Sequence, residues 1–309
     1  MKSTRAVQKI LANYEGETPG VKANLNRILM NGKLGGSGKV IILPVDQGFE
    51  HGPARSFAPN PPAYDPHYHY QLAIDAGLNA YAAPLGMIEA GADTFAGQIP
   101  TILKVNSANS LIPSEAPKTQ AITASVDDAL RLGCSAIGFT VYPGSSAALD
   151  MFSDIAAMRE EAAAKGIATV IWSYPRGEAL DKDGETAADI GAYAAQIAAL
   201  LGAHVIKVKL GTDHLSLPEA KKVYEAEKID ISTQAARVAD VMRSAFNGRR
   251  IVVFSGGSKK GTNSVYDDAR AIRDGGGNGS IIGRNTFQRE RGEAIDMLNK
   301  LIDIYKGKA

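Results

Sequence analysis

Residues 203–211 read Ala-His-Val-Ile-Lys-Val-Lys-Leu-Gly. A run of Val and Ile bounded by glycine is typical of a core β-strand. Side chains alternate along a strand, so Lys207 and Lys209 share one face of it. Burial and a second ammonium on the same face both disfavour a protonated lysine, and an uncharged lysine can attack a carbonyl carbon. The stretch therefore predicts a nucleophilic lysine; the alternative is a strand end whose lysines reach solvent.

The rest of the chain repeats this pattern of short β-branched runs, alternating with longer amphipathic segments. The strand candidates are 39–45, 78–84, 100–105, 135–141, 167–172, 204–209, 250–254 and 280–282. The helix candidates are 65–76, 125–132, 147–165, 185–201, 235–246, 265–274 and 289–305. Eight strand–helix units predict an α/β fold, a single (β/α)8 TIM barrel over residues 39–309. Residues 1–38, which carry helical patches, are predicted to form an N-terminal extension.

The composition argues against several classes of protein. The chain has 309 residues and a formal net charge of +1, without a basic stripe, so it is not expected to bind nucleic acid. Cys134 is the only cysteine, which predicts a buried thiol and neither a disulfide nor a cysteine metal site. No signal segment is visible and no apolar run reaches the roughly 18 residues of a membrane span, so a cytoplasmic protein without membrane contact is expected.

Polar residues gather where the predicted strands end. In barrels of this kind the carboxyl ends of the strands carry the chemistry. The strand ends hold Asp46 to Pro53, Lys104 and Asn106, Thr140 to Gly144, Trp172 to Gly177, Lys207 and Lys209, Ser255 to Gly257, and Gly283 to Asn285. These side chains are therefore expected to surround one opening of the barrel.

The loops after the last two strands predict a phosphate site. Ser255, Gly256 and Gly257 follow the seventh strand, and Gly283 and Arg284 follow the eighth. Glycine lets backbone N–H groups approach an anion, and this position in the fold often binds phosphate. The alternative is that these glycines only make turns.

Four further residues are candidates for the site, each with a plainer interpretation. Tyr174 lies at a strand end beside the lysine strand, where a phenol can exchange a proton with a substrate hydroxyl. Arg176 suits a second phosphate, and Asp46 can pair with an ammonium or orient a hydroxyl. The alternatives are that Trp172 and Tyr174 are core aromatics, Arg176 a solvated charge and Asp46 a loop cap.

The histidines raise a metal hypothesis. His67 and His69 are a potential ligand pair, and His51 follows the first strand. No third ligand stands at a neighbouring strand end, and short His spacings are weak signals. Structural or surface roles are therefore preferred, and no metal or other cofactor is predicted.

With these residues in place, the sequence resembles class I, Schiff-base-forming fructose-bisphosphate aldolases of the archaeal and bacterial, dehydrin-A-like type. The resemblance runs from about residue 39 to the C-terminus. The matching motifs are Leu-Pro-Val-Asp-Gln-Gly-Phe-Glu-His-Gly-Pro at 43–53, Ile-Leu-Lys-Val-Asn at 102–106, Thr-Val-Tyr-Pro-Gly-Ser at 140–145, Trp-Ser-Tyr-Pro-Arg-Gly at 172–177, Val-Ile-Lys-Val-Lys at 205–209, Ser-Gly-Gly at 255–257 and Gly-Arg-Asn at 283–285.

The resemblance implies reversible cleavage of fructose 1,6-bisphosphate to dihydroxyacetone phosphate and glyceraldehyde 3-phosphate. It makes Lys207 the Schiff-base residue, Tyr174 the acid/base and Asp46 an assisting carboxylate. The residues then expected to bind substrate are Trp172, Arg176, Lys104, Ser255, Gly256, Gly257, Gly283 and Arg284. Gln47 is given no catalytic role, because relatives often have His there.

Other functions stay open at this point. Related enzymes act on other phosphorylated sugars or carry out transaldolase-like or thiolase-like steps. A metal-dependent aldolase using the histidines and a non-catalytic sugar-phosphate-binding barrel are further alternatives. The family resemblance also implies a homo-oligomer, and the segment 228–249 leaves the number of helices before the seventh strand uncertain.

Overall fold

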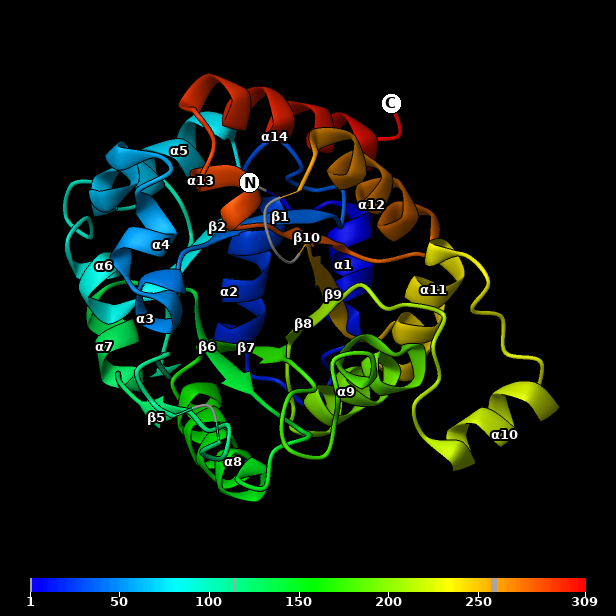
Figure 1. Cartoon of the computed structure of the whole chain (residues 1–309). Coiled ribbons are helices and arrows are strands. Elements are labelled where there is room, and N and C mark those ends of the chain that lie inside the picture. The colour runs from blue at the N-terminus through cyan, green and yellow to red at the C-terminus, as the bar shows by residue number, and fades with distance from the viewer. Residues whose placement is uncertain (1, 114, 257–259) are drawn as a thin grey trace.

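The computed structural model describes residues 2–113, 115–256 and 260–309, and within them eight parallel strands close into a barrel surrounded by helices (Figure 1). Around the barrel the order is β1, β10, β9, β8, β7, β6, β3, β2. The strands are β1 (Val40–Pro44), β2 (Ala80–Pro84), β3 (Thr101–Lys104), β6 (Ala136–Val141), β7 (Ala168–Ser173), β8 (Val205–Lys209), β9 (Ile251–Ser255) and β10 (Gly279–Ile281). The predicted TIM barrel is confirmed, with each strand within two residues of its expected ends.

The helices expected from the sequence are also present. They are α1 (Arg5–Ala12), α2 (Pro19–Met30), α5 (Pro66–Ala76), α7 (Val126–Arg131), α8 (Ala148–Ala164), α9 (Ala188–Leu200), α11 (Gln234–Ser244), α12 (Thr262–Asp274) and α14 (Arg291–Tyr305). Ser125 caps α7 through a reciprocal capping box with Asp128, as the spacing of the two residues indicated.

Several short elements within the connections were not predicted. They are α3 (Gln47–His51), α4 (Pro53–Phe57), η1 (Pro61–Tyr64), α6 (Leu85–Glu89), η2 (Gly184–Thr186), α10 (Pro218–Ala226), α13 (Arg284–Phe287) and the antiparallel pair β4 (Asn106–Ser107) and β5 (Ala121–Ile122). Helices of one turn are too short to show a period of 3.6 residues. Helix α10 points away from the barrel in Figure 1 and buries no side chain. Because none of its faces packs on a core, its sequence did not need an apolar stripe that would have revealed the helix.

The barrel separates two buried clusters of apolar side chains. Ile206 and Val208 of β8 point outward into the layer between strands and helices, whereas Val205 points into the barrel. This alternation confirms that Lys207 and Lys209 share the inner face. No helix in the described part of the chain is long and apolar enough to cross a membrane.

Helices α1 and α2 close the end of the barrel at which the strands begin. Their buried side chains Val7, Val21, Leu25, Ile28 and Leu29 join the cluster inside the barrel. In Figure 1 the two helices lie behind the barrel opening. The N-terminal segment thus supplies apolar contacts that close the barrel at the amino ends of the strands and leave the carboxyl ends open.

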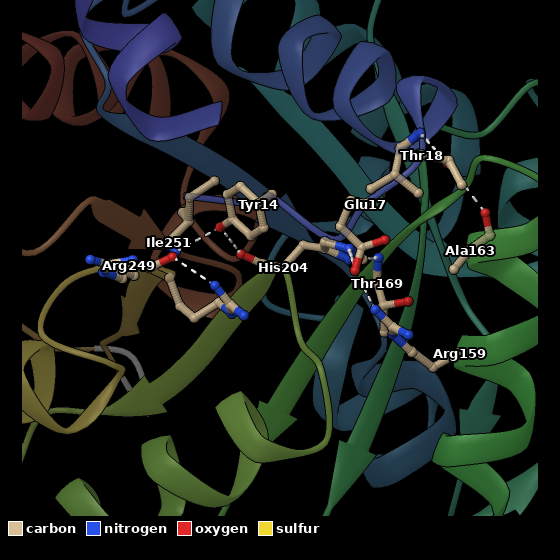
Figure 2. A network of polar contacts seen from close by, with 11 residues as sticks. Tyr14, Glu17, Thr18, Arg159, Ala163, Thr169, His204, Arg249 and Ile251 are labelled. Carbon is tan, nitrogen blue, oxygen red and sulfur yellow. Dashed lines mark hydrogen bonds and ion pairs between the residues drawn. The ribbon is translucent and has the colours of Figure 1, made fainter. Parts of the chain in front are cut away.

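A buried polar network fastens this segment to three strands (Figure 2). The Tyr14 hydroxyl donates to the carbonyl oxygen of His204 at 2.6 Å and accepts from the N–H of Ile251 at 3.1 Å. The ring of His204 accepts a hydrogen bond from the N–H of Thr169 through Nδ1, so Nε2 carries the proton and faces Glu17 at 3.2 Å. Tyr14 therefore bridges the beginnings of β8 and β9, and the ring of His204, which faces Glu17, links them to β7 through Thr169.

Replacing Tyr14 with phenylalanine is expected to lower the free energy of unfolding by about 1–3 kcal/mol, because a buried carbonyl and a buried N–H lose their shared partner. Urea denaturation measures the change. The matched control is Tyr193→Phe, since Tyr193 is 56% exposed and its loss of a hydroxyl should leave the stability unchanged. Equal stabilities for both variants would show that the bridge contributes nothing.

Candidate active site

A cavity of about 60 Å³ opens at the carboxyl ends of the strands. Most of the predicted site residues line it: Lys207, Tyr174, Asp46, Arg176, Ser255, Gly256, Gly283 and Arg284. Trp172 and Lys104, which were predicted to bind substrate, are not among the described residues that line it. Gly257 lies outside the described residues. The structure thus brings together side chains from strands that are distant in the sequence.

Lys207 is buried inside the barrel, with only 3% of its surface exposed. Its ammonium nitrogen lies 5.5 Å from the centre of the Trp172 ring and 5.3 Å from that of Tyr174. The lysine therefore does not extend to bulk solvent, which contradicts the alternative of a solvent-seeking strand end.

Burial lowers the pKa of Lys207 to about 8. Asp46 and Glu50 act in the opposite direction, because a carboxylate favours the charged amine. Lys104 and Arg284 lower the pKa further, as like charges do. At pH 7 roughly a tenth of Lys207 is consequently a free amine, far more than for an ordinary lysine.

The origin of the like charge differs from the prediction. Strand alternation suggested that the next lysine along β8 would disfavour the protonated amine. The leading neighbouring cation is instead Lys104 of β3, followed by Arg284. Alternation along a strand identifies neighbours within that strand, whereas the charge of Lys104 comes from a different strand of the barrel.

Lys104 is held in place by hydrogen bonds. Its ammonium donates to the backbone carbonyl of Asn106 and to Asn106 Oδ1, the latter at 3.0 Å. The Asn106 amide is fixed in turn by the backbone of Thr140, at 2.7 Å to its N–H and 2.8 Å to its carbonyl. Burial lowers the pKa of Lys104 to about 8. At pH 7 a pKa of about 8 leaves most Lys104 side chains charged, so Lys104 is suited to act as a positioned positive charge near the nucleophile.

Both lysine ammonium groups lie near the Trp172 ring. Lys104 Nζ is 6.0 Å and Lys207 Nζ 5.5 Å from the centre of the ring. The ring occupies space above Gly138 of β6, where an added Cβ would lie only 1.9 Å from it. Glycine at this position lets the indole lie inside the barrel, where Trp172 belongs to the buried apolar cluster.

Tyr174 follows β7 and its phenol lines the cavity beside Lys207. Burial raises its pKa well above the ordinary value, and Asp46 and Glu50 add to this rise. A hydrogen bond with the side chain of Ser255 and the charge of Arg176 act in the opposite direction. The phenol therefore keeps its proton at neutral pH and can donate it.

Asp46 and Glu50 are two carboxylates on one side of the cavity. Asp46 stands at the N-cap of α3 but makes no capping hydrogen bond, so the loop-cap interpretation does not account for it. Sequence reasoning missed Glu50, because the short helix α3 brings it back toward Asp46. Burial and the charge of Asp46 raise the pKa of Glu50.

The predicted anion loops meet on the other side of the cavity. Ser255 and Gly256 end β9, while Gly283 and Arg284 follow β10. Asn285 joins them, and its Oδ1 accepts from the N–H of Lys260 at 2.8 Å, which ties the second loop to the first. Backbone N–H groups and a guanidinium in this arrangement suit an anion.

The model of the family described as DeoC/LacD family aldolase matches residues 40–289. The chain belongs to this family of aldolases. Aldolases are lyases, so the chain belongs to a family of enzymes.

Individual relatives narrow the comparison. The chain is 35% identical over 299 residues to a probable class 1 fructose-bisphosphate aldolase of Chlamydia muridarum, covering 92% of this chain and 84% of the relative. It is 35% identical over 273 residues to the class 1 fructose-bisphosphate aldolase of Thermoproteus tenax, covering 88% and 91%. An archaeal fructose 1,6-bisphosphate aldolase solved with its catalytic lysine covalently bound to a carbinolamine intermediate matches with a TM-score of 0.73 and 33% identity, over 87% of this chain and 94% of that one.

The aldolase has a second cavity, of about 290 Å³, next to the first. Glu50, His51 and Arg176 line both cavities. The far wall comes from the loop between β4 and β5 and includes Ala108 and Ile112. The two cavities together give a substrate room to extend from Lys207 past Arg176.

The histidines of the aldolase make other contacts than metal ligation. His67 Nε2 donates to the carbonyl of Ala90 at 2.7 Å, and His69 Nε2 to that of Ala63 at 2.8 Å. Burial lowers the pKa of His69 to about 4, so its ring is neutral. Among the described residues, no three His, Cys, Asp or Glu side chains are grouped closely enough to hold a metal ion. These contacts support the structural interpretation of His67 and His69.

Proposed function

We propose that this aldolase is a class I fructose-bisphosphate aldolase that uses Lys207 as its Schiff-base residue. The observation that carries the proposal is a lysine buried inside the barrel, with its pKa lowered to about 8, beside both a phenol and an anion-binding arrangement. Sugar phosphates are the substrate class that the family and these groups support. A cytoplasmic location and a homo-oligomeric assembly stay predictions.

The reaction begins with the free amine of Lys207 attacking C2 of the open-chain ketose. The resulting carbinolamine loses its hydroxyl as water when Tyr174 donates its proton, which leaves an iminium and a phenolate. The neutral phenol, kept protonated by burial, is the form that this step needs. The iminium then acts as an electron sink for the next bond to break.

Carbon–carbon cleavage uses the phenolate just formed. Tyr174 takes the proton of the C4 hydroxyl, the C3–C4 bond breaks, and its electron pair flows into the iminium to give an enamine. Glyceraldehyde 3-phosphate leaves. Protonation of C3 and hydrolysis of the imine then release dihydroxyacetone phosphate and restore Lys207, and the reverse sequence is the aldol condensation.

The charged groups around the cavity place the two ends of the substrate. Ser255, Gly256, Gly283 and Arg284 bind the phosphate on C1, near the imine carbon, and Arg176 binds the other phosphate. Binding energy from both phosphates then positions the reacting carbons. Asp46 orients the amine and the substrate hydroxyls. Lys104 acts through its charge rather than as a substrate ligand.

Borohydride reduction in the presence of fructose 1,6-bisphosphate tests the proposal. The reduced adduct is expected on Lys207, identified by peptide mapping, because only a covalent imine is trapped by reduction. Adduct on another lysine, or cleavage that a chelator stops and borohydride does not, would contradict the assignment.

Removal of the charge at Lys104 should change the pH dependence. In Lys104→Met the carboxylates of Asp46 and Glu50 act on Lys207 with less opposition, so its pKa rises from about 8 toward the ordinary value. The acid limb of kcat/KM then moves to higher pH by roughly one unit, and the rate at pH 7 falls roughly tenfold. A pH–rate profile measures this. Lys104→Arg keeps the charge and should leave the limb in place; a limb unmoved in both variants would exclude the role.

A second candidate is a Schiff-base aldolase for another phosphorylated sugar. The second cavity supports it, since its lining combines the apolar Ala108 and Ile112 with the polar Asn109 and Ser110 and so offers both room and hydrogen-bonding groups to a sugar of another length. Rates with fructose 1,6-bisphosphate, fructose 1-phosphate and deoxyribose 5-phosphate separate the two candidates. The first requires the highest kcat/KM with the bisphosphate.

A further inference from the structure

Three charged side chains, those of Glu185, Lys209 and Arg176, lie together beside the active-site cavity. Glu185 Oε2 accepts a hydrogen bond from Lys209 Nζ at 3.2 Å and lies 3.7 Å from Arg176 Nε. Arg176 and Lys209 line the cavity, whereas Glu185 is not among the described residues that do. One carboxylate oxygen of Glu185 therefore pairs with both cations from outside the cavity lining.

The two cations flank the phenol that the mechanism uses. The Arg176 guanidinium lies 5.3 Å, and the Lys209 ammonium 5.9 Å, from the centre of the Tyr174 ring. Their side chains are only 34% and 23% exposed, so neither is a freely solvated surface charge. Two like charges this close need a counter-charge to stay together in the absence of an anion.

Glu185 is itself held by a short, well-bonded turn. It lies in η2, and its N–H donates to the carbonyl of Asp181 at 3.0 Å. Gly184 N–H donates to Asp181 Oδ1 at 2.7 Å, and the N–H of Thr212 donates to the carbonyl of Thr186 at 2.7 Å. The carboxylate thus projects from backbone that is fixed at both ends.

We propose that Glu185 is a positioning residue, which holds Arg176 and Lys209 as a preformed pair of cations for the phosphate at the C6 end of the ketose. This inference rests on the proposed function. Long basic side chains lose conformational freedom when they bind a ligand, and a fixed counter-charge removes most of that loss beforehand. Glu185 thereby determines the preference for a ketose with two phosphates over one with a single phosphate at C1.

Glu185 also keeps Lys209 charged. Burial and the neighbouring Arg176 lower the pKa of Lys209, and Glu185 is the group that opposes them. Without the carboxylate, Lys209 would lose its proton at lower pH, and the pair would carry less charge in the alkaline range. Binding of the C6 phosphate should then weaken as the pH rises.

The test compares Glu185→Gln with wild type on two substrates. For fructose 1,6-bisphosphate, KM is expected to rise about tenfold with little change in kcat, because a remote phosphate binds the ground state and the transition state alike. For fructose 1-phosphate, both constants should stay within about twofold, since no C6 phosphate is present. The alkaline limb of kcat/KM should move to lower pH with the bisphosphate only.

Two further variants test whether the effects of Glu185→Gln come from the lost charge at this position. Glu185→Asp keeps the charge, so its alkaline limb should stay with wild type even where KM rises. Glu219→Gln removes an exposed carboxylate that pairs with Lys222 on α10, and should behave as wild type with both substrates.

The outcomes are distinct. An equal loss with both substrates would make Glu185 merely structural, an unchanged KM for the bisphosphate would leave it without a role, and a lower KM would show that it competes with the phosphate; each overturns the inference. Wild-type enzyme that cleaves no fructose 1,6-bisphosphate would instead refute the proposed function itself.

Discussion

Replacement of Lys207 with methionine is expected to lower kcat for fructose 1,6-bisphosphate by about 10⁴-fold or more and to abolish borohydride trapping. The amine supplies the covalent bond to the substrate, and no hydrogen bond or charge can replace it. Methionine has a similar length and no charge, so it suits a position that is 3% exposed. The loss should therefore be chemical, with folding retained, and circular dichroism checks this.

Lys209→Met is the matched control for this prediction. Lys209 lies two residues further along β8 on the same face, but its side chain is 23% exposed and pairs with Glu185. It should weaken phosphate binding and still give a trapped adduct on Lys207. If Lys207→Met retained the adduct, or if Lys209→Met lost it, the nucleophile would have been assigned to the wrong lysine.

The barrel could be predicted because each strand carries its own local signal. Runs such as 204–209 and 135–141 are rich in β-branched residues and bounded by turns, so their ends followed from the sequence. The shared face of Lys207 and Lys209, opposite Ile206 and Val208, followed from alternation, and the outward positions of Ile206 and Val208 confirm it. These properties depend on residues close in the chain.

The charges that act on Lys207 could not be predicted in the same way. Lys104 acts on Lys207 because the closed barrel brings the inner faces of β3 and β8 together, where both ammonium groups lie near the Trp172 ring. Glu50 and Glu185 were missed because α3 and η2 are too short to leave a periodic pattern. Contacts across the barrel and within connections depend on tertiary geometry rather than on local sequence.

The place of the N-terminal segment in the fold could not be predicted either. Its helices α1 and α2 were visible in the sequence, but their position against the barrel was not. Tyr14 bonds to His204, which is 190 residues away, and no spacing rule connects two such positions. This bond also bears on the active site, because His204 immediately precedes β8 and stands three residues before Lys207. The segment therefore anchors the beginning of the strand whose end carries the nucleophile.

Tyr174→Phe is expected to reduce kcat by about 10² to 10⁴-fold while the covalent adduct still forms. Water can protonate the hydroxyl that leaves the carbinolamine, so imine formation continues more slowly. Removal of the C4 hydroxyl proton needs a base held at that oxygen, and phenylalanine offers none. Carbon–carbon cleavage should become the slow step, and the six-carbon imine should accumulate.

The mass of the borohydride-trapped adduct measures this directly. Wild type working on fructose 1,6-bisphosphate should yield three-carbon as well as six-carbon adducts on Lys207, whereas the variant should yield the six-carbon adduct almost alone. The variant removes only a hydroxyl, and its partner Ser255 lies at the open cavity, where water can take the vacated hydrogen bond. Turnover equal to wild type, or a three-carbon adduct formed at the wild-type rate, would remove Tyr174 from the proton transfers and direct attention to Asp46 and Glu50, the carboxylates across the cavity.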